Sequence, residues 1–290
     1  MKTLVFQSKI GGGSLTWDRK NMSQLKTDHL IIENCLASVQ SWCKKLGYEY
    51  RLVTKDLKWN FEFLSKNDVQ LNCAFQNWSH LPKKGYDQII YLDNDIFVSE
   101  YSGSPPIVDF GLVCRYGDQI QYAKYYCGNN SLWWNSGVVV MSQKRCRHLS
   151  NWMLDYIPRA RELPLFRDLP REESLITEYC AKYKPTKLDP IWNTMPPQTP
   201  FPMYSEAKFI HLLGASKLNT LLKCPKEIQK VVMKNIDVSE KITADTVGNE
   251  LRWQQRGRHF DRRQPRPKPN PPYFYPHQSH STMNTILKKN

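Results

Sequence analysis

The first two hundred residues alternate short apolar runs with longer amphipathic stretches, and this alternation restricts the possible folds more than any other feature. The apolar runs have the length of buried strands, whereas the longer stretches repeat apolar residues at helical spacing. Alternating strands and helices are typical of a layered α/β domain. We therefore expect an α/β fold in which a mixed, mainly parallel sheet is flanked by helices.

The pattern predicts the individual elements by their residue ranges. Strands are expected at 4–6, 48–54, 88–93, 111–115, 138–142 and 209–213. Helices are expected at 28–46, 143–156 and 170–183, and a further one through Trp78 after a capping box at Ser65 and Asp68. Asp28 is predicted to be the N-cap of the first helix and Gly47 its C-terminal stop. Pro170 suits the first position of the last helix.

Length and charge divide the chain of 290 residues into three expected parts. These are a main α/β domain over 1–224, a helical extension over 225–251 and a tail over 252–290. The tail contains nine Lys and Arg residues and one Asp, so it supplies +8 of the net charge of +14. Its proline-rich segment lacks the backbone donors that helices and central strands require, and we expect the tail to be disordered.

Several classes of protein are disfavoured. No apolar run approaches the roughly 20 residues that cross a bilayer, and the apolar stretch near the start is too short for a signal peptide. The eight cysteines form no Cys-x-x-Cys pair, so we expect reduced thiols and a cytoplasmic location. No phosphate-binding P-loop, dinucleotide-binding glycine motif or Gly-x-Ser-x-Gly nucleophile elbow is present.

The strand expected at 88–93 ends in the acidic triplet Asp93-Asn94-Asp95. In extended chain, residues two apart project from the same face, so both carboxylates can bind one cation. Carboxylate oxygens suit Mg²⁺ or Mn²⁺. The triplet is also good turn chemistry, but apolar runs on both sides favour a site, because a buried acidic pair without a counter-ion is unfavourable.

Three other segments have chemistry that is ambiguous when each is taken alone. Asn135-Ser136-Gly137 is predicted to be a polar turn that can bind a polyol or simply precede a core strand. In 211–217, His211 can ligate a metal and Lys217 can neutralise a phosphate, although a lone histidine is more often structural. Glu172 and Glu173 begin a helix, where the helix dipole alone favours acids.

Together with 4–8 and Trp192-Asn193, these segments resemble the retaining GT-A glycosyltransferases, particularly the glycogenin and galactosyltransferase-like group. The resemblance covers roughly residues 1–220, and the combination is more specific than any single segment. It implies a GT-A, Rossmann-like fold. It also implies transfer of a hexosyl group, with retention, from a nucleoside-diphosphate sugar, preferably a UDP-sugar, to a hydroxyl of a glycan, protein or small molecule.

The resemblance also implies roles for individual residues. Asp93, Asp95 and His211 would hold Mn²⁺ or Mg²⁺. The residues implied to bind the nucleotide and donor sugar are Phe6, Gln7, Ser8, Asp93, Asn94, Ser136, Gly137, Gly214 and Lys217. Those implied to be catalytic are Glu172, Glu173 and Asn135, with Glu173 nearest the oxocarbenium-like centre. The family usually has Asp-Gln at 172–173 and Pro-Trp at 218–219, where this chain has Glu-Glu and Leu-Asn.

Two other functions remain open from the sequence. A sugar nucleotidyltransferase shares this fold group, but it usually carries a glycine-rich basic motif that Gly11-Gly12-Gly13 does not match. A nucleic-acid-binding protein is suggested by the basic tail with Tyr273, Phe274 and Tyr275, which combines phosphate neutralisation with stacking. The tail can instead contact an anionic surface or a partner.

Overall fold

The structure is a computed structural model that describes residues 1–9, 22–54, 74–75, 77–81, 84–99, 102–115, 119–169, 171–196, 206–214 and 216–233. The chain divides into two compact units, Met1–Ile236 and Asp237–Asn290, and every described residue belongs to the first. The glycine run at 11–13, the capping box, Pro170 and the basic tail lie outside the described residues. The domain boundaries at 224 and 251 stay predictions.

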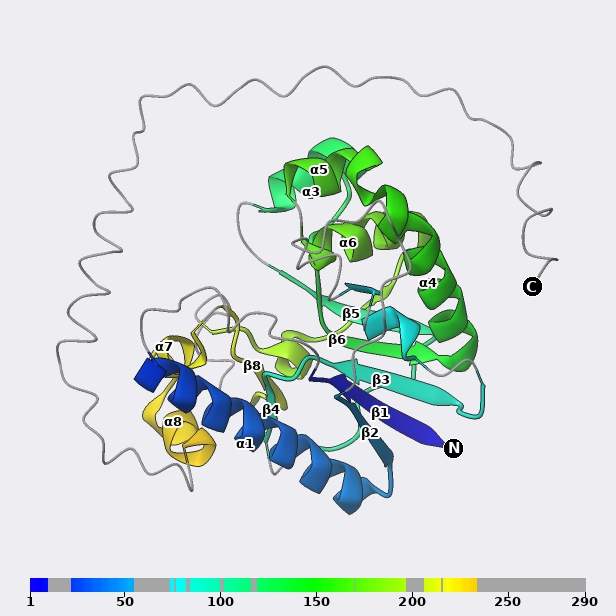
Figure 1. Cartoon of the computed structure of the whole chain (residues 1–290). Coiled ribbons are helices and arrows are strands. Elements are labelled where there is room, and N and C mark those ends of the chain that lie inside the picture. The colour runs from blue at the N-terminus through cyan, green and yellow to red at the C-terminus, as the bar shows by residue number, and fades with distance from the viewer. Residues whose placement is uncertain are drawn as a thin grey trace, which may run out of the picture. The chain divides into compact units, whose positions relative to one another are not determined.

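A six-stranded sheet in the order β2-β1-β3-β6-β5-β7 forms the centre of the first unit (Figure 1). Its strands are β1 (Thr3–Ser8), β2 (Glu49–Val53), β3 (Gln88–Leu92), β5 (Phe110–Cys114), β6 (Trp134–Ser142) and β7 (Thr186–Lys187). In this sheet only β6 runs opposite to the others. A second sheet pairs β4 (Ile96–Val98) with β8 (Phe209–His211) in antiparallel fashion. The expected mixed, mainly parallel α/β fold is confirmed.

Helices flank the sheet. The α-helices are α1 (Met22–Leu46), α3 (Gln119–Cys127), α4 (Gln143–Tyr156), α5 (Pro164–Asp168), α6 (Glu172–Tyr183), α7 (Lys217–Leu221) and α8 (Lys226–Val232), with 3₁₀ turns η2 (Ile157–Glu162) and η3 (Pro190–Asn193). The prediction that Asp28 caps α1 is wrong, because α1 begins six residues earlier and Asp28 lies inside it. Gly47 ends α1 with a φ of 69°, as predicted.

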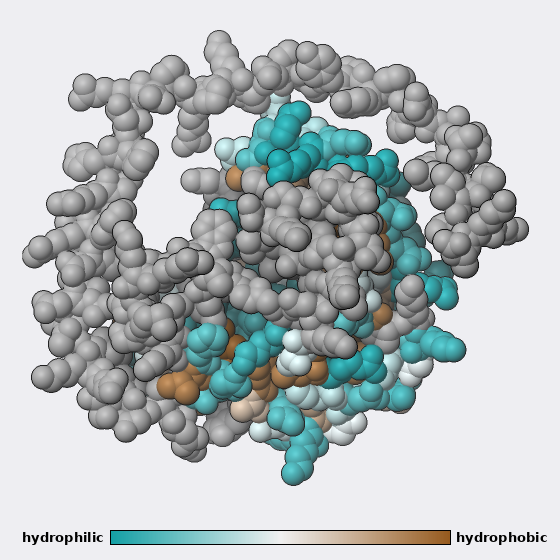
Figure 2. All heavy atoms as spheres, viewed as in Figure 1, coloured by the Kyte–Doolittle hydropathy of each residue, from teal (hydrophilic) through white to brown (hydrophobic). Residues whose placement is uncertain are grey.

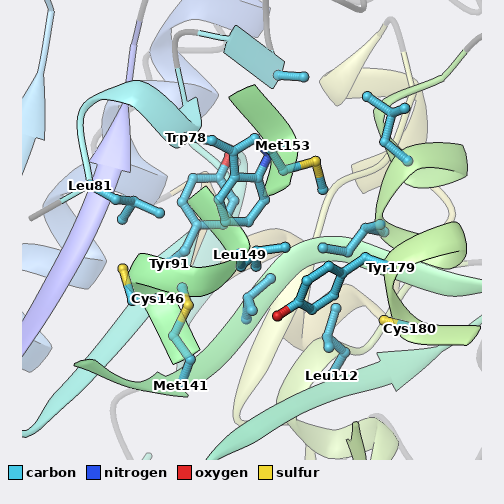
Figure 3. Close-up of a cluster of buried hydrophobic side chains, with 14 of the residues drawn as sticks. Trp78, Leu81, Tyr91, Leu112, Met141, Cys146, Leu149, Met153, Tyr179 and Cys180 are labelled. Atoms are coloured by element: carbon cyan, nitrogen blue, oxygen red, sulfur yellow. The ribbon is translucent and has the colours of Figure 1, made fainter. Parts of the chain in front are cut away.

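Both faces of the four central strands are buried, and successive strand residues point into the cores on opposite sides. On one face, Leu4 and Phe6 join a cluster with side chains of α4 and α6. Figure 3 shows part of this cluster, in which the rings of Trp78 and Tyr91 lie 5.3 Å apart between centroids. On the other face, Val5 packs with residues of α1, β4 and β8. The second sheet therefore packs against the same face of the main sheet as α1 does.

The segment Asn135-Ser136-Gly137 is not the turn that was predicted, since it lies inside β6. Pairing on both sides explains the difference. Trp134 pairs with Cys114 of β5 across an irregularity in register, and Asp93 donates its backbone N–H to the carbonyl of Gly137 at 2.8 Å. Neighbouring strands thus hold in extended form a sequence whose local chemistry favours a turn.

The surface of the first unit is mainly hydrophilic over α3, α4 and α5, as Figure 2 shows for one face. None of the helices described in the structure is both long and apolar enough to span a membrane. Seven cysteines lie in the described part, all of them free thiols and nearly all buried.

Candidate active site

The predicted metal ligands meet at one edge of the fold because β4 and β8 pair. Asp93 and Asp95 follow β3, and the chain turns directly into β4. His211 ends β8, where the register sets it opposite Ile96. The backbone N–H of Leu212 also donates to the Asp95 carbonyl at 3.1 Å. Residues far apart in the sequence are thereby fixed beside one another by backbone pairing.

The side chains of these three residues converge. Nε2 of His211 lies 3.2 Å from Oδ1 of Asp95 and 3.6 Å from Oδ2 of Asp93. One ligand atom from each residue lies within 4.8 Å of the other two. Oδ1 of Asp95 is buried and has no donor in hydrogen-bonding geometry among the described residues. Two carboxylates and an imidazole around a buried, unsatisfied oxygen fit a divalent cation such as Mn²⁺ or Mg²⁺.

Lys217 supplies a buried positive charge to the same group. Its Nζ lies 2.5 Å from Oδ2 of Asp95 and 2.7 Å from the carbonyl of Gly214, and the residue is only 2% exposed. Gly214 has a φ of 97°, a conformation that favours glycine. Burial alone would raise the pKa of Asp95, but the charges of Lys217 and His211 hold that pKa below its ordinary value. Asp95 is therefore an anion at neutral pH.

The pKa of Asp93 is instead raised, chiefly by burial and only partly offset by His211. Its Oδ1 accepts a hydrogen bond from the hydroxyl of Tyr91 at 2.7 Å. Its backbone carbonyl accepts one from Nε2 of Gln7 at 2.9 Å. Asp93 is thus held from β1 and β3 at once.

Gly137 lies against the imidazole of His211. A Cβ atom at this position would stand 2.2 Å from Cε1 of His211 and 2.6 Å from its Nδ1. Contacts below about 3 Å do not occur for real Cβ atoms, so only glycine allows β6 and the ring to approach this closely. The glycine predicted to bind the donor therefore also makes room for the histidine.

The two glutamates that begin α6 have different partners. Glu173 accepts hydrogen bonds from Arg115 at 2.5 Å, from the indole of Trp133 at 3.1 Å and from the amide of Asn135 at 2.5 Å. Glu172 accepts from the indole of Trp78 at 3.0 Å. Burial, together with the charge of Asp93, raises the pKa of Glu172 to about 8.

The other predicted donor-binding residues occupy three places. Asn94 lies in the turn between β3 and β4, and Ser136 is buried in β6. At the end of β1, Ser8 donates from its hydroxyl to Asn77. The side chain of Phe6 is fully buried in the core, and the nucleotide contact implied for the segment Phe6-Gln7-Ser8 stays a prediction.

Sequence reasoning missed several residues of this site. Tyr91 could have been found, because it is two positions before Asp93 and so on the same face of the strand. Asn193 entered only through the resemblance, yet its amide bonds to both Asn135 and His211. Arg115 gave no signal, since it meets Glu173 only after residues 58 positions apart fold together.

Comparison with known proteins gives a likeness of structure only. No family model and no curated protein matches the chain. One similar structure is a glycosyltransferase involved in the glycosylation of the major capsid of PBCV-1, at 13% identity and a TM-score of 0.47, covering 80% of this chain and 100% of that one. Another is the galactosyltransferase LgtC in complex with donor and acceptor sugar analogues, at 10% identity and a TM-score of 0.46, covering 84% and 99%. At this identity the likeness concerns the fold alone.

Proposed function

We propose that the chain is a GT-A glycosyltransferase that transfers a hexosyl group, with retention, from a nucleoside-diphosphate sugar to an acceptor hydroxyl. One observation supports this most strongly. Asp93 and Asp95 converge with His211, which comes from a distant part of the sequence, so that their ligand atoms lie within 4.8 Å of one another around an unsatisfied buried oxygen. A UDP-sugar is the proposed donor, and a glycan, a protein or a small molecule the proposed acceptor.

Mn²⁺ or Mg²⁺ would be held by Asp93, Asp95 and His211. When bound, such an ion supplies positive charge that neutralises the diphosphate leaving group. Lys217 adds a fixed ammonium beside Asp95, where it favours negative charge that develops on the leaving diphosphate. These residues hold the leaving group in a buried setting, in which electrostatic interactions are stronger than in water.

The remaining residues are proposed to bind and orient the donor. Asn94 and Ser136 lie near the same strand ends as the acidic pair. Gly137 and Gly214 would let their backbone approach the donor closely. Glu172, whose pKa is raised by burial and by the charge of Asp93, is proposed to hydrogen-bond a sugar hydroxyl. The role expected of Glu173 beside the reacting sugar carbon stays a prediction, as do those of Gln7 and Ser8.

The test is a screen of nucleotide sugars for hydrolysis and transfer, with and without Mn²⁺, on the wild type and on Asp95→Ala. We expect metal-dependent turnover to fall more than about 100-fold in Asp95→Ala, because even indirect changes at metal sites weaken binding 10- to 100-fold. Asp109→Ala is the matched control, since Asp109 is an exposed carboxylate paired with Arg145. Unchanged metal-dependent turnover in Asp95→Ala would reject the site. Pyrophosphate release from a nucleoside triphosphate and a sugar phosphate would favour a nucleotidyltransferase instead.

A further inference from the structure

A chain of hydrogen bonds leads from a buried ion pair to the ring of His211. Arg115 and Glu173 form the pair, with side chains only 9% and 12% exposed. Asn135 donates from Nδ2 to Oε1 of Glu173, and Asn193 donates from Nδ2 to Oδ1 of Asn135 at 2.6 Å. Oδ1 of Asn193 lies 3.1 Å from Nδ1 of His211. We call these five residues the relay; its two asparagines and its histidine are almost fully buried.

Two fixed groups set the orientation of the first amide in the relay. The carboxylate of Glu173, paired with Arg115, can only accept hydrogen bonds, so the nitrogen of Asn135 must face it. The backbone N–H of Gly137 can only donate, and it lies 2.9 Å from the other amide atom of Asn135, which must therefore be the oxygen. The acceptor (Glu173) and the donor (Gly137 N–H) thus require the same orientation of the Asn135 amide.

This orientation passes along the relay to the histidine. The Asn193 atom that faces the oxygen of Asn135 must be a donor, and is therefore the NH₂ group. The oxygen of Asn193 is left to face Nδ1 of His211, and because that oxygen only accepts, Nδ1 must carry a proton. In the neutral ring the lone pair then lies on Nε2, the atom that faces Asp93 and Asp95.

We propose that Glu173 is a positioning residue of the cation site. Its negative charge orients Asn135 and Asn193, and through them it keeps the proton of His211 on Nδ1 and the lone pair of Nε2 directed at the cation. Histidines that bind metals generally donate the other ring N–H to an acceptor that fixes the tautomer. Here that acceptor is an amide oxygen whose direction depends on an anion further along the relay. The proposal rests on the metal-binding part of the proposed function.

Mn²⁺ binding to the full chain without any nucleotide sugar tests the relay, with free Mn²⁺ measured by electron paramagnetic resonance. Glu173→Gln places beside Asn135 a side chain that can donate as well as accept hydrogen bonds. The amide groups of Asn135 and Asn193 can then rotate so that their oxygen and nitrogen atoms exchange places. We expect Mn²⁺ to bind more weakly, by up to the roughly 10- to 100-fold loss that follows when a group bonded directly to a metal ligand is changed. Glu178→Gln is the control on the same helix: it makes the same substitution at a half-buried carboxyl outside the relay. It should leave Mn²⁺ binding unchanged.

A double variant separates the relay from the ion pair. Glu173→Gln with Arg115→Gln removes both charges, so it avoids a buried guanidinium that has lost the Glu173 carboxylate. We expect this variant to regain most of any thermal stability lost in Glu173→Gln while Mn²⁺ binding stays weak. Recovery of wild-type Mn²⁺ affinity in the double variant would overturn the proposal, because Glu173 would then matter only as the partner of Arg115.

The tautomer can be read directly in the wild type, and a variant is needed only to assign the resonance. The chain has seven histidines, so nuclear magnetic resonance of [¹⁵N]histidine-labelled protein is tractable, and His211 is identified by its loss in His211→Gln. We expect Nδ1 of His211 to be protonated; a ring protonated on Nε2 alone would refute the relay. A wild type that binds no Mn²⁺ would instead reject the proposed metal site, and the tautomer would still decide the relay.

Discussion

Gly137 shows how one missing side chain shapes the site. The Cβ of an alanine here would overlap the ring of His211 at 2.2 Å and approach Oδ1 of Asn135 at 2.9 Å. Because β6 and the ring are both buried, neither can move freely. We expect Gly137→Ala to weaken Mn²⁺ binding more than about 10-fold, by the metal-site precedent, and to lower the free energy of unfolding by about 1–3 kcal/mol through overpacking. Mn²⁺ titration and urea unfolding measure the two effects.

Gly103 provides the control for that substitution. A Cβ there meets no atom within 4 Å, so Gly103→Ala should change neither quantity appreciably. Wild-type Mn²⁺ affinity in Gly137→Ala would mean that the ring can be displaced without loss of the cation site, contrary to the geometry described here.

Among individual residues, the sequence predicted those whose side chains are typical metal ligands. The acid pair and the histidine were recognisable as possible ligands, and the structure brings them together. The relay was not predictable, because Asn135, Asn193 and Arg115 are ordinary polar residues until folding sets them in line. Phe6 was named from its place near a strand end and its side chain belongs to the core, while the nucleotide contact implied for its segment stays a prediction.

Between elements, Asp28 joins α1 to α7. It is 2% exposed, and its Oδ1 accepts the backbone N–H of Leu218 at 2.7 Å, near the start of α7. Asp28→Ala leaves that buried N–H without its acceptor, so we expect a loss of about 1–3 kcal/mol in the free energy of unfolding. Asp28→Asn retains an oxygen acceptor and should lose less. Urea unfolding of both variants checks the order, and equal losses would contradict this role.

On α6, Glu178 makes stability depend on pH. Burial raises its pKa from 4.5 to about 7, so between these values the folded chain holds a proton that the unfolded chain releases. The contribution of Glu178 to the free energy of unfolding therefore falls as pH rises from about 4.5 to about 7, and it levels off above pH 7. Glu178→Gln cannot ionise, so its stability relative to the wild type should increase from about pH 4.5 to pH 7. Urea unfolding across pH measures this, and parallel curves for the two proteins would refute it.

The elements that could be predicted are those with a long, uninterrupted pattern. The helix expected at 143–156 is α4 with the same bounds, because its apolar spacing is continuous and its cap is clear. The start of β6 was missed because Asn, Ser and Gly favour turns, and only pairing with β3 and β5 makes them strand. The strand β4 and the helix α7 span three and five residues, too few for periodicity to show.

For the whole molecule, charge is distributed unevenly along the chain. The segment 252–290 supplies +8 of +14, and multiple basic residues bind polyanions in a salt-dependent manner. We expect a chain truncated after residue 251 to elute from heparin at clearly lower salt while it binds Mn²⁺ with unchanged affinity. If truncation also abolishes Mn²⁺ binding, the tail contributes to the folded site rather than acting as a separate polyanion-binding segment.

The pairing of β4 with β8 makes the site depend on the order in which the chain is synthesised. Lys217 and Asp95 are 122 residues apart, and the six strands of the main sheet all precede β8 in sequence. A nascent polypeptide can therefore bury much of its core while both aspartates still lack their imidazole and ammonium partners. On the proposed function, a chain that lacks β8 and α7 would hold Asp93 and Asp95 without the third proposed metal ligand, whatever else of the core has formed.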